Sequence, residues 1–268
     1  MKRVKYIILI SIGLVCMLLA YGTYRYYAPP CLKEPFPMKA ADDTLRIAYI
    51  GDSWAFMHKD HDIHLEALLE DTLHRPVKVY SHGICGLTSK EIYERMFNDT
   101  NYHVFLQRRG YHYCFISAGI NDTYKKMSTS YYKRSMDGII QFYLANNIHP
   151  IILEIPDYDI QKAYNWQKYP RKVLRHVSMF FNNTTIDCKQ IFRDALNELI
   201  SHKGYQDKVS IIRYKSWNNN YQNDLHHIYL RDGMHLNSEG YARLDSTISH
   251  EIIMQQITKS NGYGHKNY

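Results

Sequence analysis

The stretch Leu45-Arg46-Ile47-Ala48-Tyr49-Ile50-Gly51-Asp52-Ser53 decides the fold of this chain. Its first six residues are mostly apolar, which predicts a buried strand over Leu45–Ile50. Gly51 can take up a sharp turn, and a helical pattern begins at about Trp54. A buried strand that leads through a glycine turn into a helix is typical of a parallel sheet covered by helices.

Similar apolar runs alternate with helical patterns along the rest of the chain. The predicted strands are Leu45–Ile50, Val77–Tyr80, Tyr111–Ser117, Pro150–Ile155 and Val209–Ile212, and the main predicted helices are Trp54–Leu73, Ser89–Phe97, Ser130–Asn146, Cys188–His202 and Ser238–Ile257, the last capped by Ser238. This alternation predicts an α/β fold, a three-layer α/β/α sandwich with a central, mostly parallel five-stranded sheet. A strand order of 2-1-3-4-5 would place the ligand in the crevice between strands one and three.

The 268 residues are enough for one catalytic domain, which we place at residues 43–258. Residues 24–42 contain several prolines and are predicted to form an extended tether. Residues 259–268 are rich in Gly, Asn and Lys, and we expect a flexible tail there.

The N-terminal residues 1–23 differ in kind from the rest. Lys2, Arg3 and Lys5 precede an apolar run over residues 6–22, which predicts a membrane anchor or a removed signal segment. The anchor is favoured because residues 19–22 form a mediocre cleavage site. In either case the catalytic domain is expected outside the cytoplasm, in the periplasmic or extracellular part of a bacterial envelope.

The overall composition is that of a globular protein, with 45% hydrophobic and 22% charged residues. The formal net charge of +7 includes Lys2, Arg3, Lys5 and Arg25 at the N-terminal segment, so only a modest excess remains elsewhere. Basic and aromatic residues are not interleaved at a groove-reading period, and we therefore expect no nucleic-acid partner.

We predict no metal and no other cofactor. The five cysteines do not have the spacing of metal ligands. His58, Asp60, His61, Asp62 and His64 resemble a metal cluster, but their spacing does not define a third ligand, and we expect a solvated helix face instead. The sequence leaves open whether His227 borders the entrance of a site.

Polar motifs follow the predicted strands and supply the parts of a serine hydrolase. Serine is a poor nucleophile until a base takes its proton, and His235 is the candidate base for Ser53. Asp232, three residues before His235, can hold the imidazole in the required tautomer. The predicted catalytic residues are therefore Ser53, Asp232 and His235.

The attack also places negative charge on the former carbonyl oxygen, which needs preorganised donors. The backbone amide of Ser53 lies at a predicted helix N-terminus, where an anion is stabilised. Gly86 offers an amide with no side chain to obstruct a close approach, and Asn121 offers a side-chain donor. Ser53, Gly86 and Asn121 form the predicted oxyanion hole.

These motifs resemble those of the SGNH hydrolases, also called GDSL esterases and lipases. The matching blocks are Gly51–Ser53, the glycine Gly86, Gly119–Asp122 and Asp232–His235, in the order and spacing of that family. The resemblance covers about residues 45–257, and it implies the flavodoxin-like SGNH fold and the catalytic roles given above. Trp54 after the serine departs from the family pattern, as does the replacement of the usual block-two asparagine around Ser81–His82.

The resemblance and the export segment together predict a membrane-tethered, extracytoplasmic serine esterase. The expected reaction removes small acyl groups, most plausibly acetyl, from a glycan or another small ester through an acyl-serine intermediate. Three alternatives stay open, namely an acyltransferase acting on a sugar hydroxyl, a lysophospholipase or lipase, and a non-enzymatic glycan-binding module. Since the base must be neutral, activity is expected to rise through roughly pH 6 to 7.5.

Overall fold

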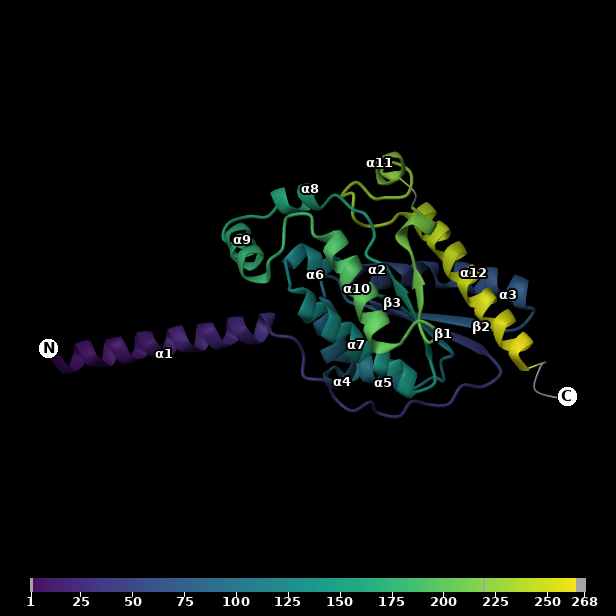
Figure 1. The fold of residues 1–268 in the computed structure, drawn as a ribbon, viewed down its shortest axis with the longest axis horizontal. Helices are drawn as coiled ribbons and strands as arrows, with labels where there is room; N and C mark the ends of the chain where they lie inside the picture. Colours follow the sequence, from purple (N-terminus) through teal and green to yellow (C-terminus); the bar gives the residue numbers. More distant parts are fainter. Residues whose placement is uncertain (1, 219, 264–268) are drawn as a thin grey trace.

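The chain forms a three-layer α/β/α sandwich in a computed structural model that describes residues 2–218 and 220–263 (Figure 1). The central sheet contains β1 (Leu45–Gly51), β2 (Val77–Gly83), β3 (Tyr113–Ser117), β4 (His149–Leu153) and β5 (Ser210–Ile212), in the order β2-β1-β3-β4-β5. All pairings among these strands are parallel. The predicted fold class and strand order are confirmed.

Helices cover both faces of this sheet. One face carries α4 (Ser89–Asn98), α5 (Thr100–Gln107), α7 (Thr129–Ala145) and α10 (Lys189–Lys203), and the other carries α2 (Ser53–His58), α3 (Asp62–Leu73) and α12 (Ser238–Tyr263). The remaining helices are α1 (Lys2–Tyr27), α6 (Ile120–Lys125), α8 (Ile160–Asn165), α9 (Arg171–Asn182) and α11 (Tyr221–Asp224), with the 3-10 turns η1 (Lys59–His61) and η2 (Tyr214–Ser216).

The two-sided burial explains why β1 is almost entirely apolar. Successive side chains of a strand point to opposite faces, so Ile47 and Tyr49 enter the core beneath α3 and α12. Ala48 and Ile50 enter the core beneath α4 and α7. These four side chains are fully buried, so the apolar run Leu45–Ile50 corresponds to a central strand covered on both faces.

Two local predictions were wrong, and one helix was not predicted. The single helix predicted over residues 54–73 is divided into α2, η1 and α3, because residue 58 is drawn into the interior and the chain bends after it. Helix α5 was not predicted, although Asp99 caps it by accepting hydrogen bonds from the backbone amides of Asn101 and Tyr102. Helix α12 is capped by Asn237 rather than Ser238, because the Asn237 side chain accepts from the amide of Gly240 at 3.0 Å.

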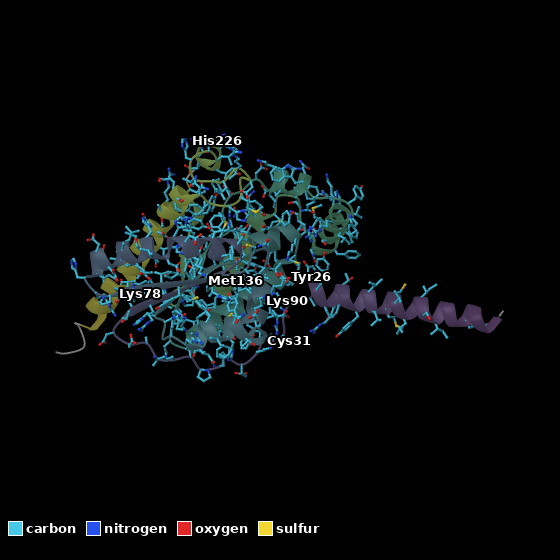
Figure 2. The ribbon with its side chains drawn as sticks, turned by 180° about the vertical axis from the view of Figure 1, so that it is seen from behind. Tyr26, Cys31, Lys78, Lys90, Met136 and His226 are labelled. Carbon is cyan, nitrogen blue, oxygen red and sulfur yellow. The ribbon has the colours of Figure 1, made fainter. Side chains whose placement is uncertain are left out.

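Helix α1 projects away from the domain, and Tyr26 lies where it meets the domain (Figure 2). The structure does not support the predicted transmembrane helix, because within residues 2–218 and 220–263 no helix is sufficiently long and apolar to span a bilayer. Of the predicted C-terminal tail, residues 259–263 continue α12, and residues 264–268 lie outside the described residues.

The segment between α1 and β1 lacks regular structure but lies against the domain. Phe36 packs against Phe97 and Phe142, with ring centroids 5.5 and 4.7 Å away. The side-chain amide of Asn146 donates a hydrogen bond to the backbone carbonyl of Phe36, and the side-chain oxygen of Asn146 accepts one from the backbone amide of Met38 at 2.7 Å. The proline-containing segment over residues 28–44 is therefore attached to α4 and α7.

Candidate active site

The carboxyl ends of β1, β2 and β3 are tied together by backbone hydrogen bonds. The last residue of β1, Gly51, pairs with Gly83 of β2 and with Ser117 of β3. Beyond it, the amide of Ile84 donates to the carbonyl of Gly51 at 3.2 Å, and the amide of Asp52 donates to the carbonyl of Ser117 at 3.3 Å. The loops that carry the polar motifs therefore begin at one edge of the sheet, at the predicted crevice.

Ser53 and His235 meet at this edge. The Oγ atom of Ser53 lies 2.9 Å from Nε2 of His235, and Nδ1 of His235 lies 2.6 Å from Oδ2 of Asp232. The Ser53 residue is 8% exposed, and the side chains of His235 and Asp232 are 24% and 36% exposed. This hydroxyl–imidazole–carboxylate series has the distances required for proton transfer from a serine to a base.

A short turn holds His235 and Asp232 in place. The Oδ1 atom of Asp232 accepts hydrogen bonds from the amides of Met234 and His235, at 2.9 and 3.0 Å. Gly233, which lies between Asp232 and Met234, has φ +68°, a conformation that glycine adopts without steric cost. Leu230 donates its amide to the carbonyl of His235 at 2.7 Å, so the base and its partner move as one unit.

The Asp232 carboxylate is ionised in this setting. Partial burial raises its pKa, but the hydrogen bonds from the His235 ring and from the backbone amides of His235 and Met234 outweigh this effect and hold the pKa below its usual value. An ionised carboxylate accepts the Nδ1 hydrogen of His235, which leaves Nε2 free of a proton to accept one from Ser53.

The three predicted oxyanion donors come from three different loops. Ser53 is the first residue of α2. Gly86 follows β2 in a turn closed by the amide of Leu87 and the carbonyl of Ile84, and its φ of +80° is typical of the third position of a type II turn. Asn121 lies in the first turn of α6, after β3. The space beside Gly86 is open, since a Cβ atom added at this residue would have no heavy atom within 4 Å.

Asp52 positions Asn121, a contact that the sequence analysis missed. The Asn121 side-chain amide donates to Oδ2 of Asp52 at 3.1 Å, while Oδ1 of Asp52 caps α2 by accepting from the amide of Trp54. Asp52 is fully buried, and burial raises its pKa to about 7 despite these hydrogen bonds. Its place beside Ser53 in a strand-ending motif was the signal available in the sequence.

Asp122 supports the neighbouring loop in a similar way. This fully buried carboxylate accepts from the amide and the hydroxyl of Ser89, at 2.8 and 2.6 Å, and so joins the start of α6 to the start of α4. Burial raises the pKa of Asp122 to about 6. The loops that carry Gly86 and Asn121 are thereby joined to each other through a contact that the motifs did not predict.

The prediction of a solvated helix face for the histidine-rich segment after Ser53 was wrong for His58, whereas Asp60 and His64 are exposed. His58 is fully buried, with Nε2 2.7 Å from Oδ1 of Asp245 and Nδ1 3.0 Å from Oδ1 of Asp62. His64 contacts the other oxygen of Asp245 at 2.8 Å. These contacts fasten α2 and α3 to α12. Among the described residues, no group of three or more His, Cys, Asp or Glu side chains is arranged to hold a metal ion.

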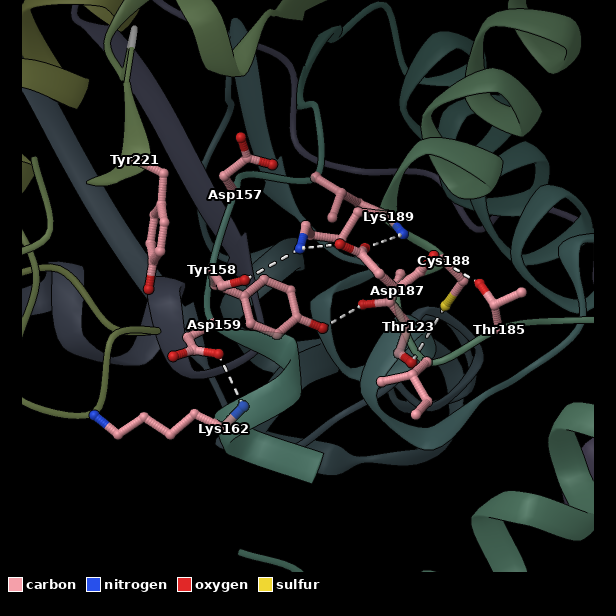
Figure 3. Close-up of polar contacts among 12 residues, drawn as sticks. Thr123, Asp157, Tyr158, Asp159, Lys162, Thr185, Asp187, Cys188, Lys189 and Tyr221 are labelled. Atoms are coloured by element: carbon pink, nitrogen blue, oxygen red, sulfur yellow. Dashed lines mark hydrogen bonds and ion pairs between the residues drawn. The ribbon is translucent and has the colours of Figure 1, made fainter. Parts of the chain in front are cut away.

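Two hollows lie beside the loop that carries Asp232 and His235. The first, about 460 Å³, has Phe56, His61 and Leu230 in its wall. The second, about 540 Å³, is lined by residues 157–161, 187, 189 and 220–222 (Figure 3). It adjoins the turn at Gly233, whose carbonyl accepts from the hydroxyl of Tyr221 at 2.7 Å and from the amide of Asp159 at 3.2 Å.

The second hollow has a polar wall. Asp157, Asp159 and Asp187 contribute carboxylates. The ammonium group of Lys189 donates hydrogen bonds to the Asp187 carboxylate at 3.0 Å and to the carbonyl of Tyr158 at 3.1 Å (Figure 3). The exposed residues His226 and His227 lie elsewhere, just after α11, where His226 marks the surface in Figure 2. His227 is not among the residues that line either hollow.

The fold and this site define an SGNH-type α/β hydrolase. The chain belongs to the GDSL-like lipase/acylhydrolase family, whose sequence model matches residues 49–243, and it is an acyl ester hydrolase of that family. No curated protein matches its sequence.

Solved structures share the fold at low sequence identity. An acetyl xylan esterase is 15% identical, with a TM-score of 0.53, over 78% of this chain and 100% of its own. The lipase/acylhydrolase from Enterococcus faecalis is 16% identical, with a TM-score of 0.52, over 78% and 95% of the two chains. An α/β hydrolase enzyme from the metagenome of Lake Arreo, Spain, is 16% identical, with a TM-score of 0.51, over 78% and 94%.

Proposed function

We propose that this hydrolase is an extracytoplasmic serine esterase that removes small acyl groups from a glycan, with acetyl as the main proposed group. The observation that carries the proposal is the 2.9 Å contact between Ser53 Oγ and His235 Nε2, continued to Asp232 at 2.6 Å. In the proposed acylation, Ser53 Oγ attacks the ester carbonyl carbon while its proton passes to His235 Nε2.

The amides of Ser53 and Gly86 and the side chain of Asn121 then stabilise the negative charge on the carbonyl oxygen. Collapse of the tetrahedral intermediate breaks the ester C–O bond, and the imidazolium of His235 returns the proton to the departing sugar oxygen. Water next attacks the acyl-serine with His235 as base. The acid leaves, and the proton is returned to Ser53 Oγ.

The proposed glycan substrate is supported by the polar hollow beside the catalytic loop. Carboxylates at Asp157, Asp159 and Asp187 can accept hydrogen bonds from sugar hydroxyl groups, and Tyr221 provides an aromatic wall. A shared fold with an acetyl xylan esterase is in keeping with this substrate class. If a sugar hydroxyl rather than water reached the acyl-serine from the same hollow, the product would be a transferred acyl group.

The proposed location rests on the N-terminal residues. Cations at Lys2, Arg3 and Lys5 followed by the apolar run 6–22 are the order found in export segments. We propose that residues 1–23 direct export of the domain. A fusion of residues 1–42 to alkaline phosphatase would be active in bacteria, and replacement of the three cations by glutamate should lower that activity; an inactive fusion would contradict the proposed location.

The catalytic proposal is tested with the full-length protein and a chromogenic acetate ester. Ser53→Ala should reduce hydrolysis by at least about 10⁴-fold. The control is Ser130→Ala, because Ser130 is an exposed serine on α7, and this variant should retain full activity. Hydrolysis that survives Ser53→Ala would refute the mechanism. Release of acetate from acetylated xylan, with and without a free sugar acceptor, then separates esterase from transferase.

A further inference from the structure

Helix α9 (Arg171–Asn182) packs against the domain through its polar side. Ser178 is 4% exposed. Arg175 and Asn182 donate hydrogen bonds to the backbone carbonyls of residues 125 and 126, at 3.0 and 2.7 Å. The inward face is therefore held by hydrogen bonds rather than by apolar packing.

The opposite face of α9 is apolar and points to solvent. Its side chains recur with the spacing i, i+1, i+4, i+7 and i+8, which normally marks the stripe of a helix that faces a core. The members and their exposed fractions are Val173 (44%), Leu174 (55%), Val177 (47%), Phe180 (82%) and Phe181 (78%). We call these five residues the outer face of α9. A contiguous exposed apolar patch of this kind marks an interaction surface.

The charges around the outer face indicate what it contacts. Residues 160–183 contain Lys162, Lys168, Arg171, Lys172 and Arg175 and no Asp or Glu, so their formal charge is +5, of which one charge belongs to the inward-facing Arg175. Exposed aromatic rings at Trp166 (64%) and Tyr169 (81%) precede the helix. An amphipathic helix with basic flanks and aromatic side chains is the form that lies in the headgroup region of an anionic bilayer.

The outer face is continuous with the apolar surface of α1. The hydroxyl groups of Tyr27 and Ser178 lie 2.6 Å apart, and a hollow of about 520 Å³ between the two helices is lined by Leu18, Leu19 and Leu174, among others. The apolar side chains of α1 from Ile10 to Leu19 are more than half exposed. Helices α1 and α9 lie on the same side of the domain (Figure 1), and both carry exposed apolar side chains.

We propose that the outer face of α9 docks on an anionic phospholipid bilayer, with Phe180 and Phe181 inserted among the acyl chains and with Arg171 and Lys172 at the phosphate groups. A second copy of the chain fits this surface less well, because it would bring a second charge of +5 against the first. The proposal does not depend on the catalytic mechanism.

Tryptophan fluorescence of the full-length protein provides a local readout. The chain has three tryptophans, of which Trp54 and Trp217 are 0% and 5% exposed while Trp166 is 64% exposed. Helix α1 contains no tryptophan. A spectral change on addition of vesicles therefore reports the region of α8 and α9 and is silent to binding through α1 alone.

With vesicles of phosphatidylglycerol and phosphatidylcholine in about equal parts, the Trp166 emission should shift to the blue and be quenched by brominated acyl chains. Phosphatidylcholine vesicles should produce neither effect. The double variant Phe180→Ser/Phe181→Ser should weaken this response about tenfold or more. Each of Arg171→Gln and Lys172→Gln should weaken it about fivefold. Ile63→Ser, at a residue 78% exposed on α3, is the control and should change nothing.

Phe180, Phe181, Arg171 and Ile63 are exposed, and Lys172 is half-buried beside the Tyr164 ring, so the variants should fold. An unchanged thermal transition verifies this. Trp166 emission that does not respond to anionic vesicles would overturn the proposal. So would an equal response in the double serine variant, because the contact would then not involve the outer face. Self-association of the wild type that the double variant abolishes, without a vesicle response, would assign the surface to a second copy instead.

Discussion

His235 Nε2 lies 2.9 Å from Ser53 Oγ, although 182 positions separate the two residues in the chain. Ser53 begins α2 directly after β1, and His235 lies in the turn that precedes α12. The hydroxyl of Tyr241 on α12 donates to the carbonyl of Trp54 on α2 at 3.0 Å, next to the serine. The distance between His235 and Ser53, the predicted base and nucleophile, is thus set by the packing of α12 against α2. Both Tyr241 and Trp54 are buried.

Replacement of Asp232 by asparagine should lower kcat by about 10³- to 10⁴-fold. The amide preserves the size of the side chain but does not hold the imidazole in the tautomer that accepts a proton from Ser53. The measurement is steady-state hydrolysis of a soluble acetate ester. Glu239→Gln removes an exposed carboxylate at the start of α12 and should have no effect. A decrease of less than about tenfold for Asp232→Asn would show that this carboxylate does not orient the base.

Asn121→Ala should lower kcat by about 10²- to 10³-fold with little change in KM, because the lost donor acts on charge that develops in the transition state. Asn101→Ala is the control, since Asn101 is an exposed residue on α5. A variant at Asn121 that raised KM alone would assign this residue to substrate binding instead.

Asp52→Asn should affect both activity and the pH dependence of stability. It should lower kcat, since Asn121 loses the carboxylate that orients its amide. Because burial raises the folded-state pKa of Asp52 to about 7, above the unfolded value of about 3.9, the folded protein binds the extra proton. Stability from this group is therefore present at low pH and is lost as pH rises from about 4 to about 7.

Urea unfolding at intervals between pH 4 and 7.5 measures this effect. Over this window the stability of the wild type should fall relative to that of Asp52→Asn, which has no ionisable group at this position. Equal slopes in the two proteins would show that the Asp52 pKa is not raised.

Gly86→Ala should destabilise the fold by about 1 to 2 kcal/mol, because φ is +80° and an added Cβ meets no other atom, so the cost is conformational. Gly204 has φ +63° and equally open surroundings at the end of α10, and Gly204→Ala should cost a similar amount. Of these two variants, only Gly86→Ala should also lower kcat, since Gly86 is a predicted oxyanion donor and Gly204 is not. Equal kcat values in both variants would remove Gly86 from the site.

His58 should make stability fall at high pH. Burial lowers its pKa, but the carboxylates of Asp245 and Asp62 outweigh this effect, and the folded-state pKa is raised above 6.5. The stability it contributes is complete below about pH 6.5 and is lost as pH rises through the raised value. His58→Gln should cost about 3 to 5 kcal/mol at pH 6, because Oδ1 of the buried Asp245 loses its charged partner and only His64 remains, on the other oxygen. The loss should be smaller at pH 9.

Thermal or urea unfolding of His58→Gln at pH 6 and pH 9 measures this difference. His250→Gln changes an exposed histidine on α12 and should alter neither value. The same loss at both pH values would mean that His58 is neutral in the folded protein at pH 6.

The strands and most of the helices could be predicted because their signals are local. A two-sided apolar run such as Leu45–Ile50 and a proline such as Pro76 act over a few residues, and the strand order then follows from connections that are short and right-handed. The break after His58 could not be predicted in this way. The partner that draws this ring inward, Asp245, lies 187 positions away and is itself buried by packing.

The features of the site also divide into those predicted from local sequence and those set by tertiary contacts. The sequence by itself determined the residue types at the site. Ser53, Gly86 and Asn121 follow β1, β2 and β3, whose carboxyl ends meet at one edge of the parallel sheet, and Asp232 and His235 precede α12. Only the tertiary structure decided the contact of Asn121 with Asp52, the support of the Ser89 loop by Asp122, and the outward direction of the apolar side of α9. These depend on which neighbour occupies each side of an element, and periodicity reports only that an element has two different sides.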